Sequence, residues 1–161
     1  MSSILKVDTI QTAAGGTPTA ASLGLNVSGS VLQVVSAYQG SGVVTFTAGA
    51  TLLTANITPT SANSKILIIA SGSSERYTST NTDHYFGNVN RSIGGGADAF
   101  LGRWADAAHY ISSTSEREHA SITILDTPNT TSQITYKMTT DVYGGGYYAK
   151  QCSITLIEIA G

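Results

Sequence analysis

Short runs in which apolar and polar residues alternate recur along most of this chain, whereas the period of an amphipathic helix is almost absent. Alternation with a period of two places apolar side chains on one face of a strand, and clusters of Gly, Pro, Asn and Ser between the runs indicate turns. The pattern predicts strands at about residues 30–37, 43–47, 51–58, 65–71, 84–92, 99–105, 119–125, 133–141 and 147–159.

Short strands at this spacing predict an all-β fold, a single antiparallel β-sandwich that is jelly-roll-like. The glycine triplets at 94–96 and 144–146 fit hairpin turns better than phosphate-binding loops, because neither opens a helix. Two long polar segments, 72–83 and 106–118, are expected to be exposed loops. The expected strands at 31–35 and 66–69 are apolar on both faces, which predicts that one face of the sandwich meets another subunit.

The first 29 residues do not follow the pattern of the rest. A short alternating run with strand character is followed by a stretch of Ala, Gly, Ser and Thr and then by a second apolar group. The apolar positions proposed to anchor this segment are Ile4, Leu5, Val7, Ile10, Leu23 and Leu25. An isolated strand is not stable in water, so we expect the segment to lie against another chain. We therefore divide the chain into an extended arm, residues 1–29, and a sandwich domain, residues 30–161.

Composition narrows the classes of partner. Charged residues make up only 11% of the 161 residues and apolar residues 41%, which is typical of a polar but uncharged β protein with an adequate core. The net charge of −2 and the scattered Lys and Arg leave no basic stripe for phosphates, so we expect no nucleic-acid partner. The sequence has neither a signal peptide nor a run of roughly 20 apolar residues, which predicts synthesis in a cytoplasm and no membrane partner.

The residues that could carry chemistry do not form a recognisable catalytic or metal-binding motif. The three histidines, His84, His109 and His119, could bind a metal only if three separate segments converged. Cys152 is the only cysteine, and its apolar alternating surroundings predict a buried side chain. Carboxylates for a depolymerase could come only from Asp83, Asp98, Asp106 and Glu116, which lack a recognisable spacing. We therefore expect a non-enzymatic protein with no cofactor and no bound metal.

Aromatic residues gather in or beside the two polar segments. Exposed aromatic faces bind sugars by stacking, while Asp and Arg supply hydrogen bonds. The candidate contacts to a receptor glycan are Tyr77, Asp83, Tyr85, Arg103, Trp104 and Tyr110. The alternative is that about half of the rings fill the core or a subunit interface.

Several segments, taken in their order along the chain, resemble one family of virion proteins. They are LKVDTIQ at 5–11, GGTP at 15–18, GSVLQVV at 29–35, ITPTSANSKIL at 57–67, DTPNTTSQITYK at 126–137 and ITLIEIA at 154–160. With them the chain resembles the small tail-fibre-like and decoration proteins of tailed bacteriophages, especially phages of cyanobacteria and other aquatic hosts.

This resemblance implies a homotrimeric β-sandwich knob on the outside of a virion, with the arm bound to phage capsid or tail proteins. The chain has no shaft repeat between arm and knob, so a short tail appendage or a capsid decoration (cement) protein fits at least as well as a long fibre. The alternative function is binding of a host surface polysaccharide through the segments 72–83 and 106–118.

Overall fold

The computed structural model describes residues 9, 11, 14–18, 28–40, 44–45, 48–76, 83–109, 117–143 and 147–161. For a few residues at strand ends only the backbone is described. The described residues form strands, turns and irregular segments, and no helix capable of crossing a membrane occurs among them.

The described residues form nine strands, as the alternation predicts. They are β1 (Val31–Gln39), β2 (Val44–Thr45), β3 (Ala50–Ile57), β4 (Lys65–Arg76), β5 (Asp83–Ile93), β6 (Ala99–His109), β7 (Arg117–Asp126), β8 (Ile134–Tyr143) and β9 (Tyr147–Ile159). Each predicted strand overlaps one of these, so the number and order of the strands are confirmed.

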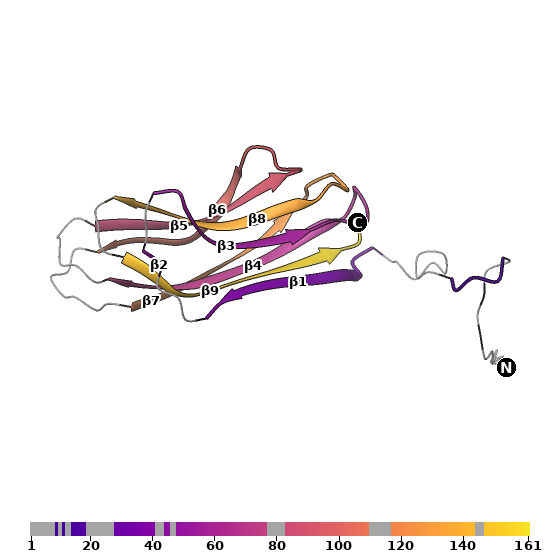
Figure 1. Cartoon of the computed structure of the whole chain (residues 1–161), viewed down its shortest axis with the longest axis horizontal. Helices are drawn as coiled ribbons and strands as arrows, with labels where there is room; N and C mark the ends of the chain where they lie inside the picture. The colour runs from indigo at the N-terminus through magenta and orange to yellow at the C-terminus, as the bar shows by residue number, and fades with distance from the viewer. Residues whose placement is uncertain are drawn as a thin grey trace.

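The strands form two antiparallel sheets that face each other (Figure 1). Sheet I has the order β1-β9-β4-β7, with the short β2 also paired to β9, and sheet II has the order β3-β8-β5-β6. The pairs are nested in sequence, because β5-β6 lies inside β4-β7, which lies inside β3-β8 and then β1-β9. This nesting is the topology of a jelly roll, so the predicted fold class is confirmed.

The core lies between the sheets and consists of the apolar residues that alternate with outward-facing ones. Its largest fully buried apolar side chains are Ile66, Ile68, Ile154 and Leu156 from sheet I and Val89, Ile134, Tyr136 and Met138 from sheet II. Because successive residues of a strand point to opposite faces, the same alternation decides which residues face solvent on the outside of each sheet.

The two segments predicted to be loops are partly strand, so that prediction is wrong over part of its length. β4 continues to Arg76, β6 continues to His109 and β7 begins at Arg117. The strand predictions stopped where polar residues begin. In the structure β4 lies between β9 and β7, which pair with its backbone on both sides and bury Ser74 and Glu75. Backbone pairing in a central strand therefore outweighs the polar character of its side chains.

The chain enters the sandwich at the end where the C-terminus lies. The chain joins sheet I at Gly29, whose N–H donates to the carbonyl of Ala160 (2.8 Å). The described residues of the arm lie beyond this end, where the C-terminus also lies (Figure 1). The six anchoring positions Ile4, Leu5, Val7, Ile10, Leu23 and Leu25 lie outside the described residues.

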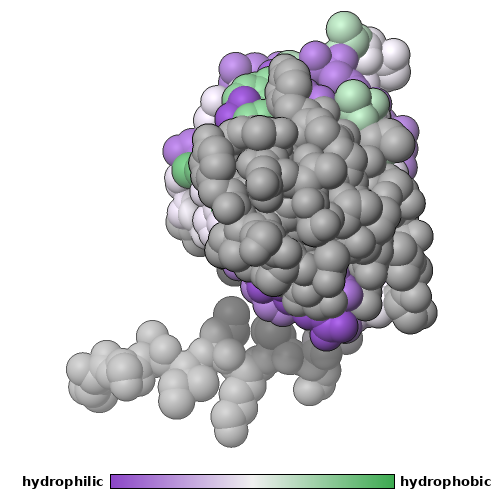
Figure 2. Space-filling model, turned by 90° about the vertical axis from the view of Figure 1, so that its left-hand side faces the viewer, coloured by the Kyte–Doolittle hydropathy of each residue, from purple (hydrophilic) through white to green (hydrophobic). Residues whose placement is uncertain are grey.

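Strands that border the segments 77–82, 110–116 and 144–146 all reach the opposite end. There Asp83 pairs with His109, and Arg76 pairs with Tyr147. Figure 2 looks onto this end, where the described residues at the rim are mainly hydrophilic with several hydrophobic ones among them. The sandwich therefore has an arm end and a distal end.

Candidate functional site

The outer face of sheet I changes from apolar at the arm end to polar towards the distal end. Near the arm end the strand register aligns an apolar row across the sheet, made of Val34, Ile157, Leu67 and Leu125. Val34 and Leu125 have exposed fractions of 58% and 54%, and it is their alignment in one row, rather than either exposed side chain alone, that is informative. The neighbouring Ile69 and Val31 are also exposed.

Further along the same face the register aligns a hydroxyl row, made of Tyr38, Ser153, Ser71 and Ser121. The Ser71 and Ser153 hydroxyl oxygens are 2.8 Å apart and share a hydrogen bond. Tyr38 stands on the edge strand β1 with an exposed fraction of 65%. Small side chains in the middle of the row leave the sheet surface uncovered.

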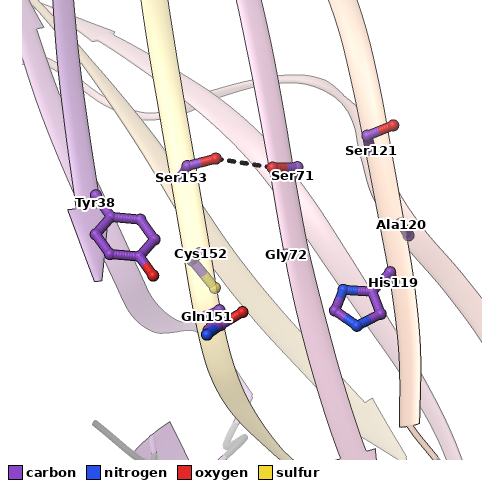
Figure 3. A pocket seen from close by; sticks show the side chains of 9 residues that line it. All are labelled: Tyr38, Ser71, Gly72, His119, Ala120, Ser121, Gln151, Cys152 and Ser153. Carbon is purple, nitrogen blue, oxygen red and sulfur yellow. Dashed lines mark hydrogen bonds between the residues drawn. The ribbon is translucent and has the colours of Figure 1, made fainter. Parts of the chain in front are cut away.

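A polar hollow of about 300 Å³ lies over this uncovered surface. Figure 3 shows Tyr38 and His119 on opposite sides of it, with Gln151 between them. The other lining residues are Ser71, Gly72, Ala120, Ser121, Cys152 and Ser153. The hollow therefore has a floor of small residues and walls that carry a phenol, an imidazole and an amide.

A second hollow, of about 140 Å³, shares His119 and Gln151 with the first and extends towards the distal end. Arg117 and Glu75 line it and form an ion pair, with the Arg117 Nε 2.8 Å from Glu75 Oε2. Their charges compensate each other. The two hollows together form a groove on the outer face of sheet I whose lining has no net charge.

Cys152 lies at the base of the polar hollow and is buried, as the sequence predicts. Burial raises the pKa of its thiol to about 11, so the thiol is protonated at neutral pH. A protonated thiol is a poor nucleophile, and Cys152 therefore acts here as a small packing residue.

Trp104, a predicted glycan contact, is instead a core residue with an exposed fraction of 2%. Its indole lies against two glycines, Gly72 on sheet I and Gly87 on sheet II. A Cβ at Gly87 would lie 2.1 Å from Trp104 Cε2, and a Cβ at Gly72 would lie 2.7 Å from Trp104 Cζ3. The prediction for Trp104 is therefore wrong, because two strands without side chains at these positions create room for the ring inside the sandwich.

Of the other predicted glycan contacts, only Arg103 has a described side chain. The Arg103 guanidinium lies 4.0 Å from the Phe86 ring centroid, and its Nη1 is 2.8 Å from Asp106 Oδ2. Only the backbones of Asp83 and Tyr85 are described, in β5, and Tyr77 and Tyr110 lie outside the described residues. Glycan binding by this set stays a prediction.

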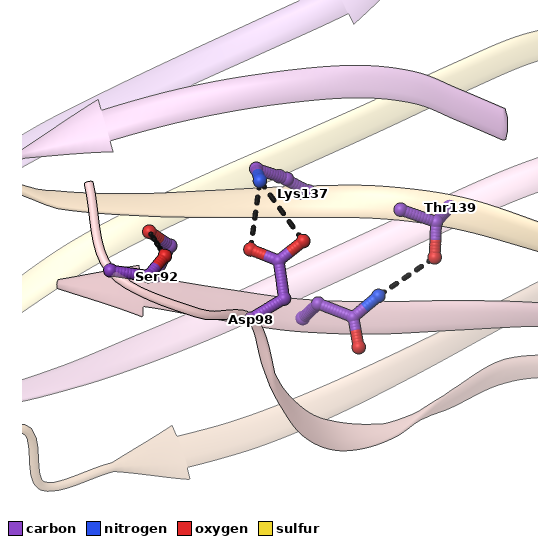
Figure 4. A network of polar contacts seen from close by, with 6 residues as sticks. Ser92, Asp98, Lys137 and Thr139 are labelled. Atoms are coloured by element: carbon purple, nitrogen blue, oxygen red, sulfur yellow. Dashed lines mark hydrogen bonds and ion pairs between the residues drawn. The ribbon is translucent and has the colours of Figure 1, made fainter. Parts of the chain in front are cut away.

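The outer face of sheet II carries paired polar side chains (Figure 4). Lys137 Nζ lies 2.7 Å and 3.0 Å from the two carboxylate oxygens of Asp98. Beside this pair the Asn90 amide donates to the Thr139 hydroxyl (2.7 Å). These side chains satisfy one another across the strands.

Among the described residues, no group of three or more His, Cys, Asp or Glu side chains could hold a metal ion. His119 lies on the outer face of sheet I, whereas His84 and His109 belong to strands of sheet II. The three histidines that could have formed a metal site are therefore divided between the two sheets.

A buried carboxylate fastens the turn between β3 and β4 at the arm end. Glu158 has an exposed fraction of 0%, and its carboxylate accepts hydrogen bonds from Gln33 Nε2 (2.5 Å), the Thr60 N–H (2.7 Å) and the Thr60 hydroxyl (2.8 Å). Burial alone would raise the pKa of Glu158, but the hydrogen bonds from Gln33 and Thr60 outweigh it and lower the pKa below its ordinary value. The carboxylate is therefore ionised at neutral pH.

A second buried carboxylate joins the two sheets. Arg91 Nη1 lies 2.7 Å and 2.9 Å from the oxygens of Asp126, which also accepts a hydrogen bond from the Tyr136 hydroxyl (2.7 Å). Burial, followed by the hydrogen bond to Asp126, raises the pKa of Tyr136 far above its ordinary value. The carboxylates of Glu158 and Asp126 therefore stabilise the fold through buried hydrogen bonds rather than facing a ligand. We take the groove on sheet I as the candidate functional site.

No protein-family model matches the sequence, and no curated protein matches it. The fold is similar to that of a chain in the structure of infectious bursal disease virus Gx strain, with a TM-score of 0.51, 14% identity, and coverage of 80% of this chain and 32% of that chain. It is also similar to a chain of the T13 particle of the same virus, with a TM-score of 0.55, 14% identity, and coverage of 80% and 31%.

A third similar structure is the CBM22-1 xylan-binding domain of Xyn10C from Paenibacillus barcinonensis, at 16% identity, with coverage of 81% of this chain and 96% of that domain. Its TM-score of 0.36 is too low to support an argument about function. The present chain spans about a third of the length of the virus chains. At these identities the likeness shows the fold alone, a β-sandwich of a kind that occurs in virus particles.

Proposed function

We propose that this chain is a non-enzymatic structural protein of a virion, in which the jelly roll is a homotrimeric knob and the arm, residues 1–29, attaches it to the capsid or tail. The observation that carries the proposal is the separation of the arm end from the distal end. Because the chain joins the sandwich beside Ala160, an arm held by another protein leaves the distal end exposed and the outer face of sheet I available to further copies of this chain.

Attachment through the arm follows from its sequence pattern. The alternating run that contains Ile4, Leu5, Val7 and Ile10 can add a strand to an exposed sheet edge of a capsid or tail protein, which would satisfy its backbone groups. Leu23 and Leu25, which precede the sandwich domain by a few residues in the sequence, would then supply a second apolar contact to that protein. The length and mainly small residues of the arm suit a tether between a knob and a particle surface.

Self-association is supported by the apolar row on sheet I. Exposed apolar rows of this kind mark interaction surfaces on soluble proteins, and the row carries no charge that a second copy would have to compensate. We propose that a second copy of this chain covers it. The row lies at the arm end, so copies that meet through it release their arms at the same end and can bind one particle together.

The assignment to tailed bacteriophages rests on the sequence resemblance, and the virus-particle fold supports the broader role of a virion protein. Jelly rolls occur in both viral capsid and lectin domains, so the fold alone does not decide between attachment to a particle and recognition of a ligand.

The number of copies per particle distinguishes a location on the capsid from a location on the tail. Hundreds of copies would indicate capsid decoration, whereas a few dozen or fewer would indicate a tail appendage.

Deletion of residues 1–26 tests the anchoring role. We expect the truncated protein to keep its β-sheet circular dichroism and its oligomeric mass, because the described core begins after this segment. We expect it to be absent from purified particles when it replaces the full chain, as measured by quantitative mass spectrometry of virion proteins. Full-length protein with Thr12→Ser is the control. Normal incorporation of the truncated protein would contradict the anchoring role.

A further inference from the structure

We infer that the polar hollow on the outer face of sheet I is a binding site for a neutral saccharide. The inference rests on the lining of the hollow and does not depend on the proposed role in a virion. It also differs from the glycan site predicted from the sequence, because it uses Tyr38, His119 and Gln151 rather than the predicted contacts.

Tyr38 supplies the surface on which a sugar ring can stack. Its side chain has an exposed fraction of 65%, and it stands at one side of the hollow rather than in the core. Gly40 lies close beside the ring, because a Cβ at Gly40 would be 2.7 Å from Tyr38 Cε1. An aromatic face that is exposed beside a polar floor is typical of sites that bind the apolar face of a sugar and its hydroxyl groups at once.

The rest of the lining supplies hydrogen-bonding groups of both kinds. The serine hydroxyls of Ser71, Ser121 and Ser153 can each donate and accept, and the Gln151 amide presents two donors and an acceptor. His119 adds a ring nitrogen on the opposite side from Tyr38. A ligand rich in hydroxyl groups, which also both donate and accept, matches this set.

Charge excludes the other common classes of small ligand. None of the nine residues that line the polar hollow is Asp, Glu, Lys or Arg, so the hollow offers no permanently charged side chain to a phosphate, a carboxylate or an amine. In the neighbouring hollow, Arg117 is already paired with Glu75 at 2.8 Å. An uncharged ligand is therefore favoured.

Size and continuity indicate how much of a glycan can be held. A volume of about 300 Å³ lies at the lower end of the usual range for ligand sites, which suits a single sugar unit. The second hollow continues from it through His119 and Gln151, so a neighbouring unit of an oligosaccharide can lie along the groove. An open site of this size predicts weak, millimolar binding of one unit and tighter binding of a short chain.

Saturation-transfer NMR on the full chain tests the inference. The probes are glucose, galactose, mannose and N-acetylglucosamine, together with their β-linked and α-linked di- and trisaccharides, and glucose 6-phosphate serves as a charged comparison. We expect saturation transfer to at least one neutral saccharide and a weaker signal for glucose 6-phosphate. Absence of transfer to every neutral probe at millimolar concentration would overturn the inference.

Three variants locate the site. Tyr38→Ala is expected to weaken binding of the best probe by about tenfold or more, while Tyr38→Phe is expected to keep most of it, because stacking persists without the hydroxyl. Phe100→Ala is the matched control, since Phe100 is exposed to a similar extent (61%) but belongs to sheet II. Equal losses in Tyr38→Ala and Phe100→Ala, or no loss in Tyr38→Ala, would show that the hollow is not the site. Particle incorporation of Tyr38→Ala is expected to be normal, so this test fails separately from the anchoring test.

Discussion

Replacement of Glu158 by glutamine tests whether the buried carboxylate holds the arm end together. Glu158 accepts hydrogen bonds from Gln33 and Thr60 and is fully buried. A glutamine oxygen can keep the two bonds from Thr60, but the amide group must then face the Gln33 amide, so that bond is lost. Hydrogen bonds to charged groups contribute about 1.5–3 kcal/mol each, and we therefore expect Glu158→Gln to lower the free energy of unfolding by about 2 kcal/mol at pH 7.

Urea and thermal unfolding followed by circular dichroism measure this loss. For a domain of this size a change of about 2 kcal/mol corresponds to a fall in Tm of roughly 4–8 °C. Asp106→Asn is the matched control, because it also converts a carboxylate to an amide but removes only the exposed pair with Arg103. Exposed pairs contribute about 0–1 kcal/mol, so the control is expected to change little.

The pH dependence gives an independent check on the same carboxylate. A folded-state pKa of Glu158 below its unfolded value means that the stabilisation is present above about pH 4–5 and is lost as pH falls through the folded pKa. The difference between the wild type and Glu158→Gln should therefore shrink in acid. The reasoning is refuted if Glu158→Gln is as stable as Asp106→Asn at pH 7, or if the difference does not shrink as the pH falls.

Two further predictions concern the core and the apolar row. Gly87→Ala should lower the free energy of unfolding by about 1–3 kcal/mol, because its Cβ would lie 2.1 Å from the buried Trp104 ring. In a chain that also carries Trp104→Phe, the added methyl should lower the free energy of unfolding by less. If the two losses measured by urea unfolding simply add, the contact between the two sites is contradicted. Leu125→Glu should convert the proposed trimer to a monomer, as measured by light scattering, without loss of the fold. Phe100→Glu on the other sheet should leave the mass unchanged, and a monomeric wild type would rule out the proposed interface.

The alternation of residues was sufficient to predict the strands and the fold class. In a strand whose apolar and polar side chains alternate, such as β9, the alternation itself shows which residues face the core, and turn residues show where the strand ends. Trp104 could not be placed in this way, because its burial depends on glycines in two other strands, Gly72 and Gly87, that lie far from it in the sequence. The end of β4 was predicted to be a loop because its side chains are polar. It is a strand because its backbone pairs with β7 and β9, which the sequence of β4 itself does not reveal.

The sequence by itself determined the number and order of the strands that the structure describes and the all-β sandwich class, because these depend on local patterns of alternation and turn residues. Tertiary structure alone decided the groove on sheet I. Tyr38, Ser71, His119 and Ser153 come from four strands, and only the pairing of those strands aligns them on one face. Register between strands is set by core packing and backbone hydrogen bonds across the whole sheet, so a surface made by register has no signature in any one segment.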